Sequence, residues 1–165
     1  MARFIFNMLL LFLLVPATQT FAQRATPSYA HYRQDANINL QGLEDQILYY
    51  INQHRKAIGK PALQMIDVAS KQATIHSVDM AKQKTPFGHE GFESRINTIT
   101  KQTGNVNAAA ENVATGKLTA QQVVDGWLHS PGHKKNIEGN YNFTGIGVAK
   151  DNNGQVFYTQ IFILK

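Results

Sequence analysis

The chain has 165 residues, a formal net charge of +5 at pH 7 and no cysteine. The absence of cysteine excludes disulfide bonds, thiol nucleophiles and cysteine-based zinc sites. The lysines and arginines are scattered along the sequence, which argues against a dedicated nucleic-acid groove.

The first 22 residues have the pattern of a secretion signal. Arg3 supplies a positive start, residues 4–15 are almost wholly apolar, and residues 20–22 end in a small residue that suits signal peptidase. The apolar run is shorter than a membrane span of roughly 20 residues. We therefore expect cleavage before Gln23 and no stable transmembrane anchor afterwards, with an uncleaved anchor as the alternative. Residues 23–39 are polar and predict an N-terminal arm or linker, followed by one domain over residues 40–165.

A helical period of apolar residues begins at Leu40. Leu43, Ile47, Ile51 and Ile58 fall on one face, and the Gly59 that follows predicts the end of this first helix.

A second helix is expected to start at Asp67 as the capping residue. Ala69, Ala73, His76 and Met80 recur on one face of it, so the spacing places His76 on the core side. We interpret His76 as structural.

Two more helical stretches follow after loops. The first covers residues 93–100, and the second begins at Thr119 with Gln122 in a capping box. In the second, Val123 and Trp127 pair at i,i+4, which predicts Trp127 as a packing residue whose indole N–H needs a partner.

The stretch "WLHSPGHKKN" holds two histidines four residues apart, a spacing that lets one helix bind a metal ion. Pro131 lies between them and would break such a helix. Ser130 and Pro131 instead predict the start of a new helix. His129 then ends one helix, and His133 lies in the first turn of the next, where the helix dipole favours neutral imidazole.

The C-terminal part predicts a β-hairpin. Residues 144–149 and 155–164 are typical of strands, and Asn153-Gly154 between them is a strong turn signal. Helices first and a hairpin last indicate an α+β fold with an antiparallel sheet covered by helices.

Six segments together resemble a known family. "ILYYINQHRKAIGKPAL", "ASKQATIHSVDMA", "FGHEGFESRI", "AAENVATG", "VVDGWLHSPGHKKNI" and "FTGIGVAKDNNGQVFYTQIF" occur in the order and approximate spacing of the bacterial, SCP-like branch of the CAP superfamily. This superfamily comprises cysteine-rich secretory protein, antigen 5 and pathogenesis-related 1. The resemblance covers roughly residues 43–163 and implies a three-layer α-β-α sandwich with a central antiparallel sheet.

The resemblance also implies a metal site. In plant and animal members, two histidines and two glutamates line a cleft that can hold a divalent metal ion. Here His89 and Glu111 match the first histidine and the first glutamate, while Ser130 and Phe157 stand at the other two positions. His133 supplies another histidine nearby. A reduced set of His89, Glu111 and His133 is a ligand set that zinc accepts, with a fourth position open to water.

The functional expectation is a secreted or periplasmic, monomeric binding module of the SCP-like type, whose cleft holds a divalent metal ion, a lipid, a peptide or an envelope component. Two alternatives remain open. One is a metal-dependent hydrolase in which Glu111 acts as ligand or base and His89 and His133 hold the ion. The other is a lipid- or sterol-binding protein. No sequence motif of nucleotide chemistry or of a serine nucleophile is present.

Overall fold

The computed structural model describes Leu40 and residues 42–165; the expected signal and arm at residues 1–39 lie outside the described residues. Five helices and four strands follow one another in this part of the chain. Their bounds are α1 Leu43–Ala57, β1 Gln64–Met65, α2 Asp67–Ala81, α3 Phe92–Thr103, β2 Ala108–Gly116, α4 Ala120–Leu128, α5 Pro131–Ile137, β3 Phe143–Lys150 and β4 Val156–Leu164. The strands form one sheet in the order β1-β3-β4-β2.

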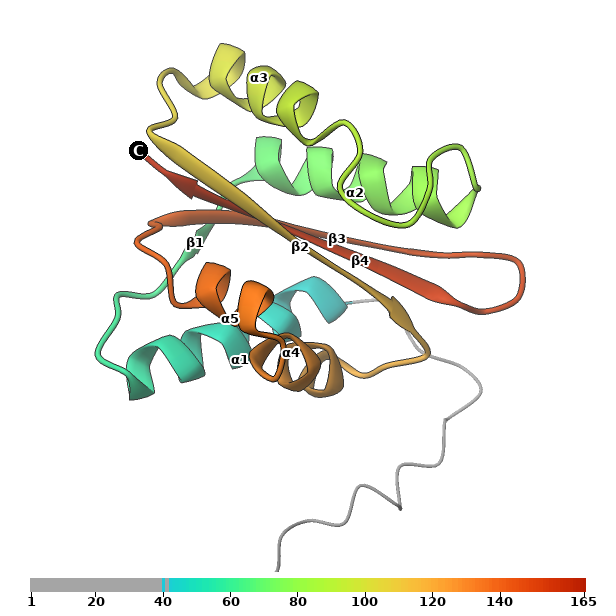
Figure 1. The fold of residues 1–165 in the computed structure, drawn as a ribbon, viewed down its shortest axis with the longest axis horizontal. Coiled ribbons are helices and arrows are strands. Elements are labelled where there is room, and N and C mark those ends of the chain that lie inside the picture. The colour runs from blue at the N-terminus through green and yellow to red at the C-terminus, as the bar shows by residue number, and fades with distance from the viewer. Residues whose placement is uncertain (1–39, 41) are drawn as a thin grey trace, which may run out of the picture. The chain divides into compact units, whose positions relative to one another are not determined.

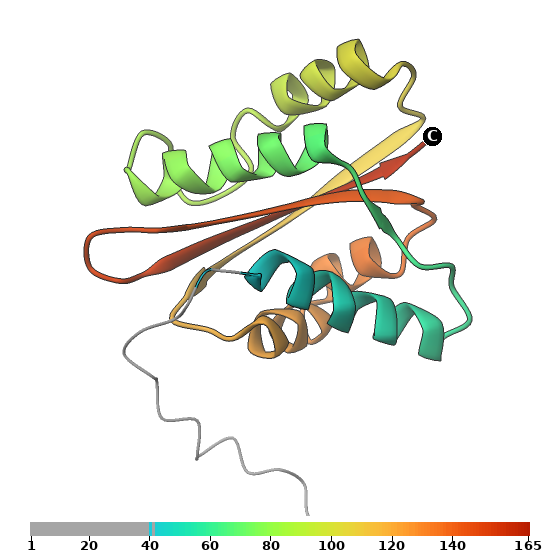
Figure 2. The same ribbon diagram turned by 180° about the vertical axis from the view of Figure 1, so that it is seen from behind.

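The sheet is the middle of three layers. Helices α2 and α3 lie over one face, and α1, α4 and α5 lie over the other (Figures 1 and 2). Strands β3, β4 and β2 are antiparallel neighbours, whereas the two-residue β1 pairs in parallel with β3. The expected three-layer α+β sandwich is confirmed. Its sheet was expected to be antiparallel, but it is mixed, because β1 pairs in parallel with β3.

Most of the predicted elements are present, with two corrections in the helices. Arg55, and not Ile58, completes the buried face of α1, because α1 ends at Ala57 and leaves Ile58 44% exposed. Arg55 is buried and donates hydrogen bonds to four carbonyls, at the end of α5 and in the loops after α1 and α5. Helix α2 is capped at Ile66, and Asp67 is its first residue and makes no capping bond.

The sequence expectations did not include β2. Its segment is rich in alanine and contains glutamate and asparagine, residue types that are depleted in strands. It is a strand because every residue of it pairs with β4, from Ala108 opposite Leu164 to Gly116 opposite Val156. Tertiary pairing therefore overrides the weak local preference.

Two glycines of β3 let α2 lie directly on the sheet. A Cβ atom added at Gly147 would lie 2.1 Å from the backbone nitrogen of Thr74, and one at Gly145 would lie 2.1 Å from the carbonyl carbon of Ala69. The backbones of α2 and β3 are thus in contact, which fixes the height of α2, and of His76 on it, above the sheet.

We expect Gly147→Ala to destabilise the protein by about 3 kcal/mol, because helix α2 must move away from the sheet to admit the methyl group. Gly132→Ala in α5 is the matched control, since a Cβ there meets nothing within 4 Å and should be neutral or stabilising by up to about 1 kcal/mol. Urea unfolding of both variants measures the difference. Equal midpoints for Gly147→Ala and wild type would contradict this close contact.

Candidate functional site

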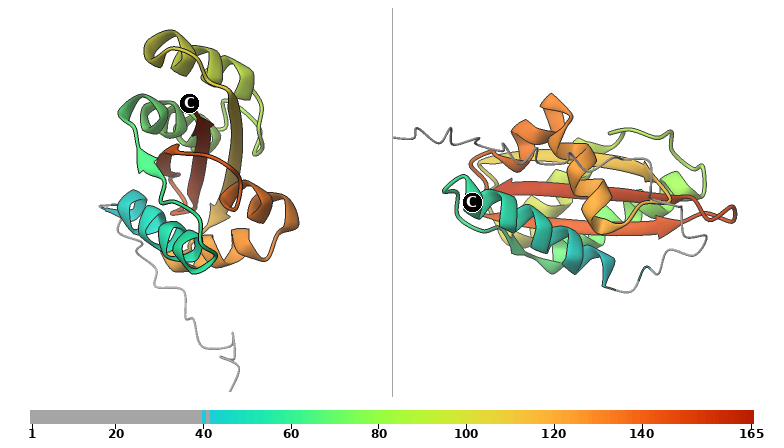
Figure 3. Two further views of the ribbon diagram at one scale, coloured as in Figure 1. Left: turned by 90° about the vertical axis from the view of Figure 1, so that its left-hand side faces the viewer. Right: turned by 90° about the horizontal axis from the view of Figure 1, so that it is seen from below.

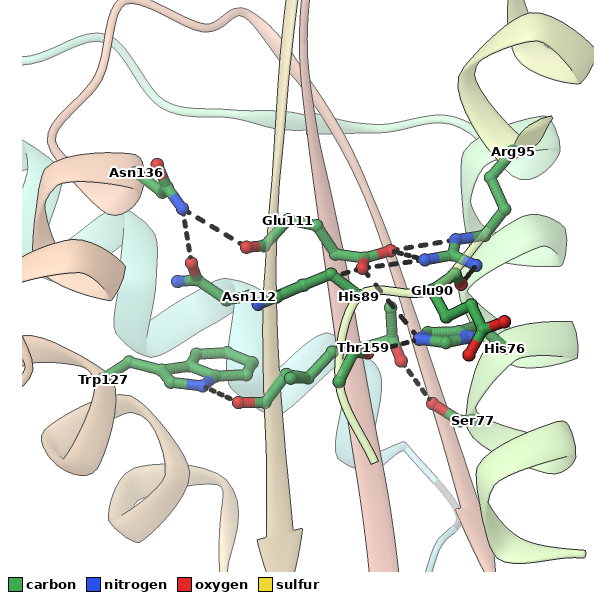
Figure 4. Close-up of polar contacts among 12 residues, drawn as sticks. His76, Ser77, His89, Glu90, Arg95, Glu111, Asn112, Trp127, Asn136 and Thr159 are labelled. Carbon is green, nitrogen blue, oxygen red and sulfur yellow. Dashed lines mark hydrogen bonds and ion pairs between the residues drawn. The ribbon is translucent and has the colours of Figure 1, made fainter. Parts of the chain in front are cut away.

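The candidate site is built around two consecutive residues of β2 whose side chains point to opposite faces of the sheet, as strand geometry requires. Glu111 points toward α2 and α3, and Asn112 points toward α5 (Figure 4). Both are buried, at 6% and 0% exposure. One strand therefore joins a charged cluster on one side to an amide cluster on the other.

On the α3 side, Arg95 holds the Glu111 carboxylate with two hydrogen bonds. Arg95 Nε donates to Oε2 at 2.9 Å and Nη2 donates to Oε1 at 2.8 Å (Figure 4). Arg95 also donates through Nη1 to the carbonyl of Glu90. The Glu111 side chain is only 2% exposed, and the planar guanidinium compensates its burial by binding both oxygens.

His89 adds a third hydrogen bond to the same carboxylate. Its Nδ1 lies 3.0 Å from Oε1 of Glu111, while its side chain is 52% exposed. Because an ionised carboxylate only accepts, Nδ1 carries the proton and donates. In the neutral ring, Nε2 is then the unprotonated nitrogen, which is free to bind a metal ion or to accept a proton.

The loop that carries His89 is held by α2 and β4. His76 Nε2 donates to the carbonyl of Gly88 at 2.8 Å and lies 4.0 Å from Oε1 of Glu111. Phe87 packs against Phe157, with ring centroids 6.5 Å apart. The predicted inward placement of His76 is confirmed, and burial lowers the pKa of its imidazole below 6.5, with a further lowering by the Arg95 charge.

On the α5 side, two asparagines tie the start of the helix to β2. Asn112 Nδ2 donates to the carbonyl of His133 at 3.1 Å, and Asn136 Nδ2 donates to Asn112 Oδ1 at 2.8 Å and to the carbonyl of Glu111 at 3.3 Å. Trp127 donates its indole N–H to the carbonyl of Val113 at 3.1 Å. This is the partner that the sequence predicted Trp127 to need.

The helix break at Pro131 is confirmed. Ser130 is the N-cap of α5 with Pro131 at the first position, and His129 ends α4 with Nδ1 bonded to the carbonyl of Asp125. His133 is half-buried. Burial lowers the pKa of His133, and its proximity to His89 lowers it further, so His133 favours the neutral form that binds metals.

The three predicted ligands are thus placed differently. Glu111 and His89 are in direct contact, whereas His133 lies on α5, where its carbonyl accepts a hydrogen bond from Asn112. The carboxylate of Glu111 is occupied by Arg95 and His89, which leaves it poorly suited to bind a metal ion directly. Among the described residues, no three His, Asp or Glu side chains are grouped as metal ligands. Glu111 fits the role of a carboxylate that orients His89.

Arg95, Asn112 and Asn136 were not identified from the sequence as parts of the site. A signal for Arg95 existed, because it lies four residues before Ile99 on a short helix and therefore on its buried face. A buried arginine requires an acidic or carbonyl partner. The two asparagines carry no such signal, since their partners come from β2 and α5 only after folding.

Comparison with known proteins identifies relatives. The family model described as CAP, cysteine-rich secretory protein family, matches residues 48–162. The uncharacterized protein YkwD of Bacillus subtilis is 34% identical over 143 residues, and the uncharacterized membrane protein YlbC of the same organism is 32% identical over 122 residues. These alignments cover 86% and 73% of this chain but only 54% and 34% of the relatives. The chain therefore matches only part of each relative.

Solved structures show the same fold. An outer surface protein from Borrelia burgdorferi superposes with a TM-score of 0.68 at 22% identity, covering 78% of this chain and 96% of that one. An extracellular protein containing an SCP domain, from Bacillus anthracis, superposes with a TM-score of 0.64 at 29% identity. The second alignment covers 76% of this chain and 41% of that protein.

We expect Arg95→Ala to destabilise the protein by about 3–5 kcal/mol, because it leaves the buried Glu111 carboxylate without its main compensating charge. The double variant Arg95→Met with Glu111→Gln should recover much of that loss, since it removes the uncompensated charge. Chemical unfolding of the single and double variants is the measurement. A loss below about 1 kcal/mol in Arg95→Ala would show that water or another cation replaces the guanidinium.

Acid should destabilise the fold through His76. Its pKa is lowered in the folded state, so the unfolded chain binds more protons as the pH falls through about 6.5, and the free energy of unfolding decreases there. His76→Gln keeps an N–H donor for Gly88 but does not titrate. We expect wild type to lose more stability than His76→Gln between about pH 7.5 and 5.5. His129→Gln, at an exposed histidine, is the control. Parallel curves for wild type and His76→Gln would contradict the expectation.

Proposed function

The chain belongs to the CAP family of cysteine-rich secretory proteins, and on that premise we propose that it is a secreted or periplasmic binding module that holds a divalent metal ion at His89 and His133. The observation that carries the metal proposal is the contact between His89 Nδ1 and Glu111 Oε1. It fixes the tautomer of an exposed imidazole so that Nε2 is available as a ligand.

Export is supported by the signal pattern of residues 1–22 and by the relative from Bacillus anthracis, which is described as extracellular. In the part of the chain that the structure describes, no helix is long and apolar enough to cross a membrane. The polar cluster of Glu111, Arg95 and His89 supports ligand binding at this place, because His89 is its exposed member.

Zinc suits this pair because it binds neutral imidazole and accepts water at its remaining positions. His133 contributes a half-buried ring whose lowered pKa keeps it neutral at pH 7. Glu111 acts indirectly: it accepts the Nδ1 proton of His89 and thereby raises the basicity of Nε2. Arg95 keeps that carboxylate in place. This assigns Glu111 an orienting role in place of the direct ligand role expected from the sequence.

The hydrolase alternative needs the Glu111 carboxylate to act as a base. Arg95 and His89 already bind both oxygens of that carboxylate, so the contacts give this alternative no support. Binding is therefore the function that the geometry supports best. Lipid or sterol binding stays a prediction.

Calorimetric titration of metal-free protein with zinc tests the proposal. We expect His89→Ala and His133→Ala each to weaken zinc binding at least about tenfold, because each removes one of two protein ligands. His129→Ala should leave the affinity unchanged, since His129 bonds to its own helix at the end of α4. Glu111→Gln should weaken binding by about 10–100-fold if it orients His89.

Circular dichroism of every variant separates loss of ligand from loss of fold. If wild-type protein binds no zinc at millimolar metal concentration, the proposed metal site is wrong. Loss of binding in His129→Ala but not in His133→Ala would show that the wrong histidine has been assigned.

A further inference from the structure

The turn between β3 and β4 contains Asn153, the one asparagine of the chain that is followed by glycine. The hairpin of β3 and β4 reaches beyond the helices that cover the sheet (Figure 1 and the right panel of Figure 3). Asn153 is exposed and Gly154 is partly exposed. Water therefore reaches this pair of residues, which lies outside the candidate site.

An asparagine before a glycine brings two reactive groups together. The backbone nitrogen of Gly154 attacks Cγ of Asn153 and closes a succinimide ring, and the side-chain nitrogen leaves as ammonia with the proton of the Gly154 N–H. Water then opens the ring at either of its carbonyls. One product is an aspartyl residue, and the other is an isoaspartyl residue whose backbone runs through the former side chain. Glycine permits the attack because no Cβ hinders the approach of its nitrogen.

In the folded turn, Asp151 holds the groups that must react. The N–H of Gly154 donates to the carbonyl of Asp151 at 3.1 Å. Oδ1 of Asp151 accepts from the N–H groups of Asn153 and Gln155, each at 2.8 Å. One residue thus binds three successive amides. The attack requires the Gly154 nitrogen to give up its proton and to reach Cγ, so the turn must open first.

Positive charges surround the place where the reaction occurs. A Cβ atom added at Gly154 would lie 3.6 Å from Nζ of Lys117. The attacking form of the amide nitrogen has lost its proton and is negative, and a neighbouring cation stabilises a negative group. Lys82 and Lys150 line the same hollow as Asn153, between the end of α2 and the hairpin. The carboxylate of the product therefore forms near cations that favour it.

We infer that Asn153 is a site of spontaneous deamidation, and that Asp151 sets its rate by keeping the turn closed. The reaction adds one negative charge to the tip of the hairpin. The isoaspartyl product also lengthens the backbone of the turn by one carbon atom, directly after the last pair of the ladder, Lys150 opposite Val156. The hydrogen bonds to Asp151 do not all fit this longer backbone. The inference is independent of the proposed metal site.

Long incubation of purified protein in mildly alkaline buffer, followed by trypsin digestion and mass spectrometry, tests the inference. Trypsin cuts after Lys150, so residues 151–165 form one peptide that holds Asn152 and Asn153. A sample taken at the start corrects for conversion during digestion. We expect the change of mass from amide to acid at Asn153. Asp151→Ala should convert at least about tenfold faster than wild type, which corresponds to about 1.4 kcal/mol less free energy for opening the turn.

Asn152→Gln is the matched control. Asn152 lies in the same turn but is followed by asparagine, so this variant should convert at the rate of wild type. Circular dichroism checks that each variant is folded. If Asp151→Ala does not fold, wild type alone provides the comparison, because the chain in guanidinium chloride should convert at least about tenfold faster than the folded chain.

Three results would overturn the inference. The first is folded wild type that stays unmodified throughout the incubation while the unfolded chain converts. The second is conversion at Asn152 in place of Asn153. The third is an equal rate in wild type and Asp151→Ala, or in folded and unfolded wild type, which would show that Asp151 does not restrain the turn.

Discussion

The buried pair of Glu111 and Arg95 is the interaction on which the rest of the site depends. A carboxylate that is 2% exposed is stable only when its charge is compensated, and Arg95 does so with two hydrogen bonds from α3. The pair therefore links α3 to β2 at a defined position. Its remaining hydrogen-bonding capacity is used by His89, whose orientation at the surface follows from the buried pair beneath it.

The second constraint is the free edge of β2. Unpaired strand edges promote aggregation unless they are covered, and here the side chains of Asn136 and Trp127, from α5 and α4, bond to the carbonyls of Glu111 and Val113 on this edge. Asn136 is also bonded to Asn112, which in turn binds the carbonyl of His133. Covering the edge and positioning His133 are thus performed by the same amide cluster.

The candidate site residues come from distant parts of the chain. His89 comes from the loop before α3, Glu111 from β2 and His133 from α5, and each is held by a different partner.

The sequence by itself determined the elements with strong local signals. The period of Leu43, Ile47 and Ile51, the capping box at Thr119 and the break at Pro131 are local, so they are readable without a structure. Six segments in family order also predicted the layers of the fold and the positions of His89 and Glu111. Only the tertiary structure decided that the alanine-rich segment is a strand, because its stability comes from pairing with β4. Likewise, only the tertiary structure decided that Arg95 binds the Glu111 carboxylate. The two residues are 16 positions apart in the sequence, and the partner of a buried charge depends on which side chain the packing of the elements brings next to it.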